Sequence, residues 1–138
     1  MHMDVNKKVL ALVAIVVMFL FAITFMDSDE ETYVAEVKAS LTQIDGVAEK
    51  LKSIDAAGDK KALLAAYDEI IEVATHATRL SPPSTMQTFN KELKAYMKAT
   101  KEGYELIRSG TVSGDASLVS QGILLLSDLD PAFINEIR

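Results

Sequence analysis

A lone histidine and a glutamate one helical turn before it are the first residues in this chain that could bind a metal. His76 is the only histidine after position 2, and Glu72 precedes it by four residues, so both would share one helix face. The pair could supply half of a metal site, or His76 could ligate haem together with Met86 or Met97. A di-iron bundle needs two Glu-x-x-His motifs, and zinc sites need three or four protein ligands. We therefore interpret His76 as a surface residue near a helix C-terminus, and we predict no metal and no other cofactor.

Four lysines at spacings of three, four and three residues would form a basic stripe along one side of a helix. Such a stripe could meet an anionic ligand, an acidic face of a partner, or the glycan or lipid of a cell envelope. The alternative is a solvated face that pairs with neighbouring glutamates and acidic helices. Both interpretations stay open, and the possible interaction stripe comprises Lys91, Lys94, Lys98 and Lys101.

Residues that usually carry catalysis are missing or isolated. The chain has no cysteine, no Gly-x-Ser-x-Gly nucleophile context and no glycine-rich loop of the phosphate-binding type. We expect it not to be an enzyme and to have no catalytic residue. Four tyrosines lie in or beside apolar stripes, where they could line a pocket between helices or pack with the hydroxyl at the rim. They are Tyr33, Tyr67, Tyr96 and Tyr104.

The elements that would position these residues are amphipathic helices. Apolar residues recur every three or four positions across four segments, and no segment alternates as a strand does. Short connections between such helices predict an antiparallel four-helix bundle. The expected helices span residues 30–56, 60–80, 82–109 and 116–128.

Glycine, proline and aspartate mark the expected helix ends. Gly58 is expected to stop the first helix, a glycine twice precedes an aspartate that caps the next helix, and a proline twice follows a capping residue. The run 109–114, rich in serine and glycine, is expected to be a flexible loop. The glycine pairs are Gly58-Asp59 and Gly114-Asp115, and the proline pairs are Ser81-Pro82 and Asp130-Pro131, the last before a short final turn.

The longest apolar stretch, Val9 to Met26, has eighteen residues without charge, glycine or proline. As a helix it would rise about 27 Å, against a bilayer hydrocarbon core of about 30 Å. A cleaved signal peptide is the alternative, but it usually has a shorter apolar region and a small-x-small cleavage site, which Phe25 and Met26 disrupt. We predict an uncleaved transmembrane signal-anchor helix over residues 9–26.

Charges on the two sides of this stretch predict its orientation. Residues 1–8 contain two lysines and one aspartate, whereas four acidic residues lie within positions 27–31. The positive-inside rule makes residues 1–8 a short cytoplasmic tail and residues 27–138 an extracytoplasmic domain of a single-pass cell-membrane protein. The anchor could continue into the first amphipathic helix, since the first glycine is Gly46. Alternatively, Ser28 and the glutamate three residues later could form a capping box that starts a new helix.

Composition limits the partners of residues 27–138. This part carries 12 basic and 19 acidic residues, which argues against nucleic acid or anionic lipid as the main partner. Without cysteine there is no disulfide framework, so a domain of this size must be held by its apolar core alone.

The order of features resembles small membrane-anchored extracytoplasmic helical-bundle proteins of prokaryotes, whose function is mostly undefined. The features are the anchor, a helical hairpin, Leu80-Ser81-Pro82-Pro83, a tyrosine-bearing helix, and Gly114-Asp115 before a last helix. The N-terminal apolar helix is also similar to that of type IV pilins. However, Val9 stands where pilins have glycine or alanine, and the glutamate found early in the pilin helix is missing, so we do not predict a pilin.

These observations predict a non-catalytic accessory or interaction subunit on the outer face of the membrane. Its expected partners are membrane lipid, through residues 9–26, and either another protein or further copies of itself in the membrane. The alternatives are a tethered ligand-binding helical module and a pilin-like or virion structural subunit.

Overall fold

A computed structural model of the chain describes residues 29–137, and every regular element in that range is helical. The all-α prediction is therefore confirmed for this part. The predicted tail (1–8), the predicted transmembrane helix (9–26) and the proposed cap at Ser28 lie outside the described residues. The α-helices are α2 (Asp29–Ala56), α3 (Lys60–Ala77), α4 (Gln87–Ser113) and α5 (Ala116–Ser127), and the 3₁₀ helices are η1 (Ser84–Met86) and η2 (Pro131–Ile137).

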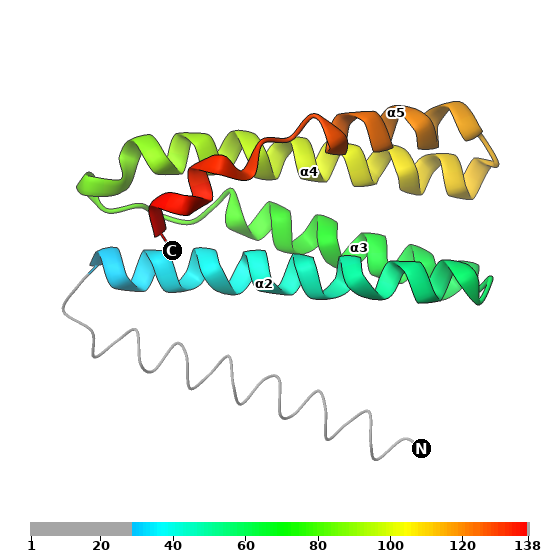
Figure 1. The fold of residues 1–138 in the computed structure, drawn as a ribbon, viewed down its shortest axis with the longest axis horizontal. Coiled ribbons are helices and arrows are strands. Elements are labelled where there is room, and N and C mark those ends of the chain that lie inside the picture. The colour runs from blue at the N-terminus through cyan, green and yellow to red at the C-terminus, as the bar shows by residue number, and fades with distance from the viewer. Residues whose placement is uncertain (1–28, 138) are drawn as a thin grey trace, which may run out of the picture.

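Successive α-helices run in opposite directions and pack in chain order, α2 on α3, α3 on α4 and α4 on α5 (Figure 1). After α5 the chain crosses back over α4, so that η2 and the C-terminal end of the chain lie near the beginning of α2 (Figure 1). Within the described range no single helix is long and apolar enough to cross a membrane. By length and composition, α5 and η2 together could, with a bend of 42° between them.

The apolar faces of the helices meet in two clusters. The larger cluster joins α2, α3, α4 and η2 near the start of α2, and the smaller one joins α2 and α3 beside Tyr104 of α4. Each of α2, α3 and α4 therefore presents the predicted stripe to a shared core, whereas α5 contributes no side chain to either cluster. Side chains buried in the larger cluster are Tyr33, Val37, Ala74, Ala77, Leu80, Phe89, Leu93, Met97 and Ile137, and those in the smaller are Val47, Ala66 and Ile70.

The predicted helix stop at Gly58 and the predicted caps at Asp59 and Asp115 are confirmed. Gly58 and Gly114 take left-handed backbone conformations, with φ of 70° and 71°, which glycine adopts without steric cost. The Asp59 carboxylate accepts a hydrogen bond from the Ala62 N–H at 3.0 Å, and the Asp115 carboxylate accepts one from the Ser117 N–H at 2.9 Å. Local sequence therefore sets where α3 and α5 begin.

Two predicted boundaries of α4 are wrong. A helix beginning at Pro82 would need that residue to be helical immediately before another proline, which steric clash disfavours. The chain stays irregular through Pro83, and α4 begins only at Gln87, after η1.

The predicted flexible loop at 109–114 is also wrong, because α4 continues to Ser113. Hydroxyl groups there bond to carbonyl oxygens of the preceding turn, as Thr111 Oγ1 does to Ile107 O at 2.7 Å. Such bonds let serine and threonine remain in a helix, and only Gly114 ends it.

Glycines let α4 and α5 come into backbone contact. A Cβ placed on Gly122 of α5 would lie 2.5 Å from the Gly103 carbonyl oxygen and 2.6 Å from Cγ1 of Ile107, both in α4. A Cβ on Gly110 would lie 2.6 Å from the Asp115 carbonyl oxygen. Gly103 weakens α4 intrinsically by about 1 kcal/mol relative to alanine. This close contact explains why glycine is nevertheless suited to the position.

We expect Gly122→Ala to destabilise the fold by about 1–3 kcal/mol, because its methyl group would force α4 and α5 apart. Gly46→Ala is the matched control, because Gly46 lies inside α2 and a methyl group added there would meet no neighbouring atom within 4 Å. This substitution should stabilise the fold by about 0.5–1 kcal/mol. Urea unfolding followed by circular dichroism measures both. Equal effects of the two substitutions would contradict the close contact.

Candidate functional site

The four lysines predicted as an interaction stripe all lie in α4, as the spacing requires. Lys91, Lys94 and Lys98 are exposed, and no carboxylate of the described residues lies within 4.0 Å of their amino groups. Lys101 differs, because its Nζ lies 3.9 Å from Oε1 of Glu105, one turn further along α4. The stripe thus consists of three unpaired lysines near the start of α4 and one paired lysine further along.

The structure places His76 at the exposed end of α3. Its side chain is exposed in the last turn of α3, as is that of Glu72 one turn earlier. Nowhere within residues 29–137 do three histidine, cysteine or acidic side chains gather in a group that could hold a metal ion. The helix dipole favours a positively charged residue at this end of α3, which is the role predicted for His76.

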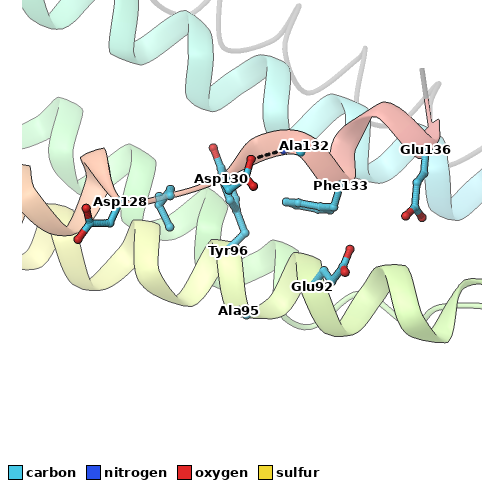
Figure 2. A pocket seen from close by; sticks show the side chains of 9 residues that line it. Glu92, Ala95, Tyr96, Asp128, Asp130, Ala132, Phe133 and Glu136 are labelled. Atoms are coloured by element: carbon cyan, nitrogen blue, oxygen red, sulfur yellow. Dashed lines mark hydrogen bonds between the residues drawn. The ribbon is translucent and has the colours of Figure 1, made fainter.

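A groove between α4 and η2 brings together residues that the sequence analysis did not connect. It has a volume of about 600 Å³ and is bounded by the end of α5 and the turn that follows it. Figure 2 shows the rings of Tyr96 and Phe133 between Asp128 on one side and Glu136 on the other. The two ring centroids are 5.4 Å apart. The remaining lining residues are Glu92, Ala95, Leu129, Asp130 and Ala132.

This groove is acidic and aromatic, a lining that suits weak contact with an organic cation. Its described lining contains no histidine, cysteine, serine or lysine that could act as a nucleophile. One of its carboxylates already has a structural role, because Asp130 Oδ1 accepts a hydrogen bond from the Ala132 N–H at 3.0 Å and so begins η2 (Figure 2). The sequence signalled that cap, but it gave no indication that η2 would fold back over Tyr96.

The outward side of α5 is uncharged. From Ala116 to Ser127 the helix has no ionisable side chain, and only Gly122 is buried. The side chains of Ile123 and Leu124 are 53% and 63% exposed, an unusual degree for large apolar residues. This side of α5 is therefore a second surface on which a partner could pack.

Comparison of this chain with protein-family models, with curated proteins and with solved structures finds no match.

The tyrosines occupy different environments. Tyr33 is 2% exposed, and its hydroxyl donates a hydrogen bond to Asn90 Oδ1 at 2.6 Å, joining α2 to α4. Burial raises the pKa of Tyr33 to about 12. Tyr67 and Tyr104 lie with their rings 6.0 Å apart, and burial also raises the pKa of each. Of the four, Tyr96 lines the acidic groove, and Tyr33 borders a separate hollow between the start of α2 and residues 79–83.

Tyr33→Phe should destabilise the fold by about 1–3 kcal/mol at neutral pH, because it leaves the buried Asn90 carbonyl without its donor. The pKa of Tyr33 is raised from 10.0, so folding favours the neutral phenol. Its contribution is complete below pH 10 and is lost as the pH rises towards 12. Urea unfolding between pH 8 and 12 should therefore show a steeper alkaline loss of stability in the natural chain than in the variant.

Tyr96→Phe is the control, since the Tyr96 hydroxyl has no hydrogen-bond partner among the described residues, and it should change stability by less than about 0.5 kcal/mol. A Tyr33→Phe variant as stable as this control would show that the bond to Asn90 contributes nothing.

Proposed function

We propose that this chain is a non-catalytic, single-pass membrane protein whose helical domain acts as an accessory or interaction subunit on the outer face of the membrane. The observation that carries the proposal is the uncharged run Val9–Met26, with lysines before it and acidic residues after it. Its length fits a bilayer, and its flanking charges favour an extracytoplasmic position for residues 27–138.

In this proposal the described helices form a bundle that stands on the anchor. α2, α3 and α4 share the core, and the fourth position is divided between α5, packed on α4, and η2, packed against the larger cluster. An antiparallel four-helix bundle above a transmembrane helix is therefore the architecture that we propose for the whole chain.

Two exposed surfaces of different chemistry support the role of an interaction subunit. The start of α4 offers unpaired lysines, and α5 offers a side with Ile123 and Leu124 and no charge. Uncharged surface with exposed large apolar residues is more typical of protein contacts than of ordinary solvated helix faces. The groove of Figure 2 is the observation that favours the tethered ligand-binding module instead.

We expect the full-length chain to stay in the membrane fraction after alkaline carbonate extraction, with an intact mass that includes residues 1–26. Val17→Asp places a charge at the middle of the apolar run, at a cost of roughly 3 kcal/mol for insertion, and should shift the chain out of the membrane fraction. Val17→Leu is the matched control and should behave as the natural chain does. Release of the natural chain by carbonate, or a mass that lacks the first 26 residues, would contradict the proposal.

A further inference from the structure

The unpaired lysines lie at one end of α4. Lys91 is four residues and Lys98 eleven residues from the first residue of this helix, which places them about 6 Å and 16 Å along its axis. With Lys94 between them, they follow the i, i+3, i+7 pattern of one helix side. Two glutamates, Glu102 and Glu105, follow the other end of the stripe. Their negative charges weaken the positive potential of the lysines there, and Glu105 also pairs with Lys101.

This end of α4 lies beside the start of α2. Thr85 Oγ1, in η1 just before α4, donates a hydrogen bond to Glu30 Oε2 in the first turn of α2 at 3.0 Å. One turn further along α2, the bond from Tyr33 to Asn90 joins α2 to α4 itself. Figure 1 shows the start of α2 and the start of α4 at the same end of the molecule. The polypeptide that precedes Asp29 is therefore attached at the end that carries the three lysines.

We propose that Lys91, Lys94 and Lys98 dock the helical domain onto anionic phospholipid headgroups of the membrane in which the chain is anchored. This inference rests on the proposed function, because residues 9–26 must hold the domain at that membrane. The lysines then act at very high effective concentration, since only a few residues separate the apolar run from α2. The ligand class is the phosphate headgroup, which amino groups bind as hydrated point charges.

At this end of the bundle the three lysines lie on α4, whereas the acidic first turn belongs to α2, so the net charge of the domain does not by itself decide the docking. Surface charges interact over about 10 Å at 0.1 M salt. The charged groups that face the bilayer therefore determine the attraction to it, and the net charge of the whole domain does not. Asp29, Glu30 and Glu31 lie in the first turn of α2, where their negative charges interact favourably with the helix dipole. Glu92 lies in the groove beside Phe133, away from the lysine side of α4. An anionic surface thus repels the α2 side and attracts the α4 side, which would tilt the domain onto α4.

The absence of cysteine makes a direct test possible. Gln87 is exposed at the start of α4 and precedes Lys91 by four and Lys94 by seven residues, so it shares their side of the helix. The full-length Gln87→Cys chain, labelled with a fluorophore, is reconstituted into vesicles of phosphatidylcholine alone or mixed with phosphatidylglycerol. Both kinds of vesicle contain a lipid with a quencher on its headgroup.

We expect severalfold stronger quenching in the phosphatidylglycerol vesicles at low salt, and loss of that difference at about 1 M salt, where the screening length is only about 3 Å. Replacing Lys91, Lys94 and Lys98 together by glutamine should abolish the difference. The matched control replaces Lys52, Lys60 and Lys61 by glutamine, which changes the charge equally at the opposite end of the bundle, and should retain it. A label at Ala57→Cys, at that opposite end, should show no lipid-dependent quenching.

Flotation of the vesicles separates the two proposals. If the chain floats with both kinds of vesicle but is quenched equally in each, the docking proposal is overturned and the anchor proposal stands. The lysines would then form a face that contacts an acidic protein. Equal quenching of the two lysine variants would also overturn it. A chain that does not float with either lipid removes the anchor and, with it, this inference.

Discussion

A buried hydrogen bond between Tyr33 of α2 and Asn90 of α4 fixes the end of the molecule on which its other features depend. Both side chains are almost completely withdrawn from water, so each needs the other as a partner. The neighbouring Phe89 meets the ring of Tyr33 edge-on at 6.2 Å and that of Phe133 at 5.4 Å, which holds η2 against the same end. Because α2 and α4 are joined there, the lysines of α4 lie where the chain enters the domain.

The opposite side of α4 is built by a different kind of contact. Gly103, Gly110 and Gly122 let α4 and α5 approach closely: the backbone of Gly122 lies against that of Gly103, and the side chains of Leu126 and Val119 in α5 lie over Gly103 and Gly110. These contacts lie on the side of α5 that faces α4, and Gly122 is the only residue of α5 that is buried. Ile123 and Leu124 remain exposed because α5 packs on α4 and contributes no side chain to either core cluster.

Local signals in the sequence predicted the helices well but not their long-range arrangement. Apolar periodicity and the glycine–aspartate pairs located α2, α3 and α5 because those features act within a few residues. The start of α4 was missed where two prolines adjoin, and its end was missed because Gly110 serves contact with α5, which no local pattern reveals. The lysine side of α4 followed from spacing alone, but its position beside the start of α2 and the return of η2 over Tyr96 depend on tertiary packing.

We propose on these grounds that the domain lies outside the cell membrane, with the end formed by the starts of α2 and α4 towards the bilayer. The most direct measurement is reaction of a membrane-impermeant maleimide with single-cysteine chains in intact cells. Ala57→Cys, in the exposed connection between α2 and α3, should react without lysis, and Asn6→Cys, in the predicted cytoplasmic tail, only after lysis. Reaction of Ala57→Cys only after lysis would contradict the account.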